Sequence, residues 1–238
     1  MPLRERAFIA LQHCLPRRWL TRLVYRLTRI RLAPLKNLTI RWFVRQFRVD
    51  VSEAENAVPG GYLSFNDFFT RALRTGARPL PQTATAFSSP CDGTVSQLGR
   101  IDGGTLLQAK GHRYSVAALL GDAGLAGRFD GGRFVTIYLA PYDYHRVHMP
   151  IAGRLRRDRR LGADLYSVND ATARRIDRLF VRNERVVALF DSDAGPLALV
   201  FVGALNVGSV STVWGGELRA GFGTPPADWH ERDLALAR

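Results

Sequence analysis

Residues 134 to 150 have the sequence FVTIYLAPYDYHRVHMP, a β-branched run that leads into a loop with a proline near each end. Alternating β-branched and aromatic residues are typical of a strand, and Pro141 marks its end. Three further runs of this kind are separated by Gly, Asp and Pro turns, namely residues 93–98, 186–190 and 197–205. We therefore predict a mostly antiparallel β core, with one short helix at residues 115–120.

The first 48 residues differ from the rest in charge. They contain twelve Arg or Lys and one acid, Glu5, so eleven of the thirteen net positive charges lie here. Residues 15–30 and 35–47 have helical periodicity, and Pro34 is expected to separate them. In the second predicted helix, the arginines at 41, 45 and 48 are expected opposite one apolar face formed by Leu38, Trp42, Phe43 and Phe47. The fold class predicted is α+β, with a basic helical module at residues 1–50 and a β-rich core at residues 51–238.

Basic helices with Leu and Trp on one face are typical of segments that lie on an anionic membrane surface. We expect lipid contact through six residues: Arg18, Trp19, Arg22, Arg26, Arg29 and Trp42. The alternative is a pair of surface helices packed on their own domain, with solvated arginines. A nucleic-acid partner is not expected, because no recognised binding motif accompanies the charge.

Residues 195–214 carry no charge and are long enough to span a bilayer. Their glycines, polar residues and valines favour two buried strands joined by a turn instead. Any membrane association is therefore expected to be peripheral.

His145 and His148 lie three residues apart. On a regular strand such residues point to opposite faces, and no Cys or acid lies at a zinc-like spacing beside them, so no metal site is predicted. Separate acid–base roles suit imidazoles, which titrate near neutrality. The alternative is that one or both are structural. The Asp92-Gly93 pair by itself indicates a turn, and Cys91 is interpreted as structural because no activated-thiol signature surrounds it.

Six blocks in order along the chain resemble bacterial phosphatidylserine decarboxylases: residues 65–74, 92–99, 108–115, 144–150, 180–186 and 202–210. The resemblance implies a proenzyme that cleaves itself at a serine near its C-terminus. This serine becomes a pyruvoyl group on the small α chain, and the cofactor forms a Schiff base with phosphatidylserine to yield phosphatidylethanolamine. By the same resemblance, Asp92 and His148 occupy the Asp and His positions that activate the serine. His145 matches the histidine expected to assist decarboxylation.

The resemblance also implies partners and a location. The expected partners are phosphatidylserine, an anionic membrane surface, the pyruvoyl-bearing α chain and a second α–β unit in a homodimer. The expected location is peripheral, at the cytoplasmic face of the inner membrane.

The printed sequence has no Leu-Gly-Ser-Thr-type motif before Arg238, and Gly208-Ser209 belongs to an earlier block. We therefore expect the 238 residues to be the β-chain portion and inactive by themselves. A fragment or interrupted gene is favoured over a separately encoded α segment or a degenerate homologue, because Asp92, His145 and His148 are all present. Two functional alternatives stay open: decarboxylation of another seryl phospholipid, and a non-catalytic protein that binds membrane surfaces.

Overall fold

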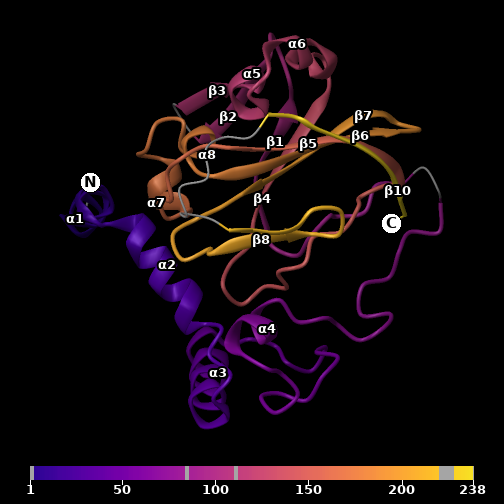
Figure 1. Ribbon diagram of the computed structural model, residues 1–238. Coiled ribbons are helices and arrows are strands. Elements are labelled where there is room, and N and C mark those ends of the chain that lie inside the picture. Colours follow the sequence, from indigo (N-terminus) through magenta and orange to yellow (C-terminus); the bar gives the residue numbers. More distant parts are fainter. Residues whose placement is uncertain (1–2, 84–85, 110–111, 220–227, 238) are drawn as a thin grey trace. The chain divides into compact units, whose positions relative to one another are not determined.

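The computed structural model describes residues 3–83, 86–109, 112–219 and 228–237, drawn in colour in Figure 1. Helices near the N-terminus are followed by antiparallel sheets, which confirms the predicted α+β class. The chain forms two compact units. We call Met1–Tyr25, Gln97–Thr136 and Arg154–Ala235 the sheet unit, and Arg26–Ser96, Ile137–Gly153 and Leu236–Arg238 the histidine unit. The predicted module of residues 1–50 contributes to both units, and its functional meaning stays a prediction.

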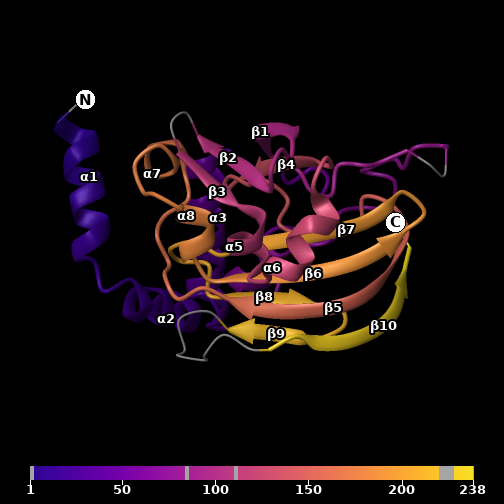
Figure 2. The ribbon, with the colours of Figure 1, turned by 90° about the horizontal axis from the view of Figure 1, so that it is seen from above.

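A four-stranded sheet in the order β10-β5-β6-β7 organises the sheet unit (Figure 2). Its strands are β5 (Gly153–Leu161), β6 (Arg185–Ser192), β7 (Gly195–Val202) and β10 (His230–Leu236). The predicted run at 186–190 is entirely buried in β6, as expected for an apolar strand in the middle of a sheet. Strand β5 was not predicted, because its arginine-rich sequence hides the core positions Leu155 and Leu161.

Short helices pack against this sheet around one hydrophobic core that includes Leu120, Leu161 and Val187. They are α5 (Val116–Leu120), α6 (Ala123–Ala126), the 3₁₀ turn η1 (Gly127–Phe129), α7 (Asp170–Ala173) and α8 (Leu179–Arg182). The predicted helix at 115–120 is confirmed as α5, and the Ser115 side chain accepts a hydrogen bond from the Ala118 N–H at its start.

Within the described residues, three two-stranded sheets accompany the four-stranded sheet. They are β1 (Thr94–Arg100) with β4 (Arg133–Tyr138), β2 (Thr105–Ala109) with β3 (His112–Ser115), and β8 (Ser209–Thr212) with β9 (Gly216–Arg219). The predicted strands at 93–98 and 134–139 are thus confirmed. Strands β7 and β8 confirm two strands within residues 195–214, but most of their residues are half-buried and not buried as predicted. Among the residues that the structure describes, no helix has the length and apolar character needed to cross a membrane.

The predicted N-terminal helices are confirmed as α2 (Arg17–Leu27) and α3 (Ala33–Phe47), and α1 (Leu3–Cys14) precedes them. Pro34 was expected to lie between helices, but it lies in the first turn of α3. Proline suits this position because the first N–H groups of a helix have no intrahelical acceptor.

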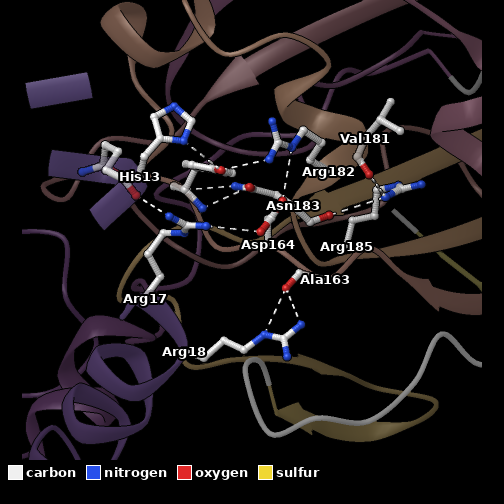
Figure 3. Close-up of polar contacts among 11 residues, drawn as sticks. His13, Arg17, Arg18, Ala163, Asp164, Val181, Arg182, Asn183 and Arg185 are labelled. Carbon is white, nitrogen blue, oxygen red and sulfur yellow. Dashed lines mark hydrogen bonds and ion pairs between the residues drawn. The ribbon is translucent and has the colours of Figure 1, made fainter. Parts of the chain in front are cut away.

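Arginines at the start of α2 bind other parts of the sheet unit through hydrogen bonds and an ion pair (Figure 3). Arg18 donates two hydrogen bonds to the Ala163 carbonyl, at 3.2 and 2.8 Å. Arg17 pairs with the Asp164 carboxylate at 3.3 Å, and its guanidinium lies 3.9 Å from the centre of the Tyr166 ring. These contacts fix α2 through its polar side chains and not through its apolar face.

Helix α3 packs within the histidine unit through Ile40 and Phe43, which share a second core with Tyr62 and Phe68. The prediction that Phe43 lies on one apolar face with Leu38 and Trp42 is therefore wrong. Leu38 and Trp42 are 66% and 57% exposed, whereas Phe43 is buried. The helix has enough apolar residues for two faces, one for the core and one that stays open.

Candidate functional site

The three predicted catalytic residues lie on two neighbouring segments of the histidine unit. Asp92 precedes β1, whereas His145 and His148 lie in the loop that follows β4. The backbone N–H of His148 donates to the Pro90 carbonyl at 2.7 Å. The backbone N–H of Ser88 donates to the Pro150 carbonyl at 2.8 Å and joins the same two segments. The structure therefore brings the Asp92 and His148 segments together across a sequence separation of more than fifty residues.

Gly93 explains why these segments can lie so close. Its φ is +130°, and a Cβ at this position would lie 2.4 Å from the Tyr138 carbonyl oxygen. No side chain fits in that space. The Asp92-Gly93 pair is thus a turn that also permits close approach to the end of β4.

The carboxylate of Asp92 is bound by Arg78. The guanidinium donates to the two oxygens of Asp92 at 2.9 and 2.6 Å, and it donates to both oxygens of Glu53 at 2.8 and 2.9 Å. These hydrogen bonds lower the pKa of Asp92, and the nearby charges of Arg71 and His148 act in the same direction. Asp92 is therefore ionised at neutral pH. The roles of Arg78 and Glu53 could not be predicted from the sequence, because neither residue lies in a recognisable pattern.

His145 has its hydrogen fixed on one nitrogen. Nδ1 lies 2.8 Å from the Asp143 carbonyl oxygen, which can only accept, so Nδ1 carries the hydrogen. The ring lies 3.9 Å from the Phe69 ring, centre to centre. Burial lowers the pKa of His145, so the imidazole is neutral at neutral pH. Its Nε2 is thereby left as the atom that takes up and releases a proton.

His148 is exposed, and its Nε2 lies 3.0 Å from the Tyr144 hydroxyl. The two rings stack with centres 5.6 Å apart at an angle of 21°. Asp92 and His148 thus interact electrostatically, but the hydrogen bonds described for their side chains go to Arg78 and Tyr144 respectively. Sequence reasoning did not single out Tyr144.

Two further groups lie near these residues. Arg71 is buried, its guanidinium lies 5.2 Å from the centre of the Phe68 ring, and its Nε has no hydrogen-bond partner among the described residues. Its positive charge lowers the pKa of Asp92 and of His145. Burial raises the pKa of the Cys91 thiol to about 11, so that thiol is protonated at neutral pH and a poor nucleophile.

The histidines do not share a ligand position, because each has its own polar partner. Within the described part of the chain, no three His, Cys, Asp or Glu side chains are placed to hold a metal ion.

The residues predicted to contact lipid lie on α2 and α3 and in the turn between them. Trp19 and Trp42 are 62% and 57% exposed, and Arg26 is also exposed. On α2 the buried side chains are Thr21 and Tyr25. Of its apolar residues, Trp19 and Leu27 are exposed, whereas Leu20, Leu23 and Val24 are half-buried. The Arg18 guanidinium is partly occupied within the protein, because it donates two hydrogen bonds to the Ala163 carbonyl.

The fold and the site define an α+β protein in which one ionised carboxylate and two imidazoles lie on neighbouring segments. A family model described as phosphatidylserine decarboxylase matches residues 65–227, and one described as PSD matches residues 7–48. The chain belongs to the phosphatidylserine decarboxylase family.

Its relatives include curated proteins named phosphatidylserine decarboxylase proenzyme. Those from Shewanella sp. (strain MR-4), Shewanella putrefaciens (strain CN-32 / ATCC BAA-453) and Shewanella baltica (strain OS155 / ATCC BAA-1091) are each 51% identical over 223 residues. Each alignment covers 93% of this chain and 75% of the relative. Asp92, His145 and His148 all lie inside the segment that the first family model matches.

Proposed function

We propose that this chain is part of an enzyme that converts phosphatidylserine to phosphatidylethanolamine and that is made as a self-cleaving proenzyme. Family membership supports the reaction. The structural observation that carries the proposal is the close approach of the Asp92 segment to His148, next to a second imidazole in a more buried position. One imidazole is then available for cleavage and the other for decarboxylation.

Asp92 and His148 are proposed to activate the hydroxyl of the relay serine of the proenzyme. A serine hydroxyl is a poor nucleophile until a base removes its proton. His148 takes that proton, and the negative charge of Asp92 stabilises the imidazolium that forms. Arg78 and Glu53 hold the Asp92 carboxylate in place.

The cofactor implied by the family is a pyruvoyl group, which supplies an electron sink for decarboxylation when it is present. The residues here fit such a group. His145 offers Nε2 for proton exchange beside the apolar ring of Phe69, and burial keeps it neutral. We propose that Nε2 of His145 carries the proton that replaces the carboxyl group of the substrate.

Arg71 is the proposed cation for the anionic headgroup. A buried guanidinium is costly unless anions compensate it, and the carboxylates of Asp92, Asp50 and Glu53 act on Arg71 in this way. An anionic headgroup would add to this compensation. Phosphatidylserine carries both a phosphate and a carboxylate, and either matches the geometry of a guanidinium. We expect Arg71 to contribute mainly to substrate binding.

The same proposal places the enzyme at the cytoplasmic face of the inner membrane as a peripheral protein. On α2 and on α3, exposed Trp and Leu residues lie beside arginines, which suits an anionic lipid surface. The homodimer of α–β units stays a prediction.

The experiment uses an extended chain, in which residues 228–238, including β10, are replaced by the corresponding C-terminal segment of the Shewanella sp. (strain MR-4) proenzyme. It is incubated with phosphatidylserine vesicles, and phosphatidylethanolamine is measured by mass spectrometry. We expect self-cleavage and conversion in the unmodified extended chain. In His145→Ala we expect cleavage with a loss of conversion of about 100-fold or more.

A matched control is His112→Ala, which changes a histidine of the sheet unit and should leave conversion unchanged. The proposal is overturned if an extended chain that has cleaved itself and carries the pyruvoyl group releases no phosphatidylethanolamine.

A further inference from the structure

The side chain of Tyr144 contacts that of His148. It lies four residues earlier in the same irregular loop and is only 7% exposed. Its hydroxyl is 3.0 Å from Nε2 of His148, and its ring stacks on the imidazole. A buried tyrosine hydroxyl normally has a polar partner, and here that partner is the proposed base.

The direction of this hydrogen bond decides the chemistry of His148. A neutral imidazole carries its hydrogen on one nitrogen and a lone pair on the other. If the Tyr144 hydroxyl donates to Nε2, the hydrogen of His148 lies on Nδ1. If the hydroxyl instead accepts, Nε2 carries the hydrogen and has no lone pair with which to take a proton.

Burial raises the pKa of Tyr144, so the phenol keeps the hydrogen that it would donate, but a neutral phenol can also accept. The charge of Asp92 favours the hydroxyl as donor. The ionised carboxylate of Asp92 is close enough to interact with His148. The negative charge of Asp92 favours a hydrogen on Nδ1 of His148, the nitrogen that does not contact Tyr144, over a lone pair there.

We propose that Tyr144 is a positioning residue for His148: its hydroxyl donates to Nε2 and holds the imidazole as the Nδ1–H tautomer. In this tautomer Nε2 is the basic atom and Nδ1–H is a donor for a carboxylate. Stacking of the two rings fixes the plane of the imidazole at the same time.

This arrangement also defines where the reacting serine hydroxyl would bind. The Tyr144 hydroxyl occupies a hydrogen-bonding position at Nε2 that a serine hydroxyl needs. When the serine approaches, one hydroxyl replaces another, and the tautomer of His148 does not have to change. Tyr144 thus acts through His148 and does not itself touch the scissile bond.

The role of Tyr144 in a reaction rests on the proposed function, since it requires His148 to activate a hydroxyl. The tautomer itself is measurable without any reaction. We would label the 238-residue chain with ¹⁵N-histidine and record the Nδ1 and Nε2 signals of His148, assigned with His148→Gln. The expected spectrum has an N–H-type Nδ1 and an acceptor-type Nε2.

The test variant is Tyr144→Phe, which keeps the ring and removes only the hydroxyl. Loss of one hydrogen bond should shift the tautomer ratio of His148 toward Nε2–H by about 2- to 10-fold. The matched control is Tyr142→Phe in the same loop, because Tyr142 is 52% exposed. That variant should leave both His148 signals unchanged.

An Nε2–H form as the main tautomer of the unmodified chain overturns the proposal, even if the variant does not fold. An unchanged ratio in folded Tyr144→Phe overturns it as well. Self-cleavage of the extended chain is a separate experiment that tests the proposed function. There, Tyr144→Phe should slow cleavage by a similar factor, whereas His148→Ala should abolish it. Full cleavage in His148→Ala would contradict the proposed function and leave the tautomer result standing.

Discussion

Arg78 binds both carboxylate oxygens of Asp92, at 2.9 and 2.6 Å, while the same guanidinium is held by Glu53. This three-residue bridge connects loops that lie up to 39 positions apart in the sequence and fixes the orientation of the proposed catalytic carboxylate. It also keeps Asp92 ionised, which a partner of an imidazolium has to be.

Removal of Arg78 should weaken the fold modestly and in a way that depends on pH. The side chains of Arg78 and Asp92 are both partly exposed, so their interaction is weakened by solvent. A double-mutant cycle of Arg78→Ala and Asp92→Asn should therefore give a coupling free energy of about 0.5–1 kcal/mol at pH 7. Since folding lowers the pKa of Asp92, this stabilisation is present above its ordinary value of 3.8 and is lost as the pH falls. Urea unfolding at pH 7 and pH 3 measures it. An equal coupling free energy at both pH values would contradict the assignment.

Gly93→Ala should be severely destabilising. The added Cβ would lie 2.4 Å from the Tyr138 carbonyl oxygen, and the φ of +130° is strained for alanine. We expect a loss of about 3 kcal/mol in the free energy of unfolding. Gly76→Ala is the control, because Gly76 also has a positive φ of +83° but no atom within 4 Å of its Cβ position. It should lose only about 1 kcal/mol. Equal losses in the two variants would show that close approach at Gly93 is not the cause.

His145 should make the stability of the protein sensitive to mild acid. Burial lowers its pKa from the ordinary value of 6.5, so the folded state favours the neutral imidazole. This contribution is complete above pH 6.5 and is lost as the pH falls below it, because the unfolded chain binds the proton first. Relative to His145→Gln, the unmodified chain should therefore lose stability between pH 7.5 and pH 5.5. Thermal or urea unfolding checks this, and a constant difference between the two proteins would refute it.

The exposed tryptophans should contribute to membrane binding. Trp42→Ser should lower the partition onto anionic vesicles by about 10-fold, because the indole no longer buries its apolar surface in the lipid. Arg26→Gln should lower it by about fivefold at low salt and by less at high salt. The control is Val213→Ser, which changes a residue that is 84% exposed but lies outside the helices. Vesicle sedimentation measures the partition, and equal binding by all four proteins would favour the alternative of plain surface helices.

Much of the fold could be predicted, because the strongest signals are local. The apolar run in β6, the turn-bounded runs in β1 and β4 and the periodicity of α2 and α3 each need only a few neighbouring residues. Strand β5 could not be predicted in this way. Its Asp158 is buried and pairs with Arg232 at 2.6 Å, so a charged strand position is stabilised by a residue 74 positions away.

The site was predicted only in part, for a similar reason. His145, His148 and Asp92 come from short motifs and from a family resemblance. Arg78, Glu53 and Tyr144 act through contacts that depend on how loops meet, and an arginine or tyrosine in a loop carries no sequence signal of its own. The two-sided character of α3 also depends on which side of the helix the core covers.

Asp92 and His148 are proposed to act together to activate a hydroxyl for self-cleavage. The most direct measurement is the rate at which the extended chain cleaves itself, followed by gel electrophoresis and mass spectrometry, in the unmodified form and in Asp92→Asn. The Asn variant keeps the size of the side chain and removes its charge, so the rate should fall by about 10³-fold or more, as in Ser–His–Asp enzymes. Cleavage of folded Asp92→Asn at the unmodified rate would contradict the claim.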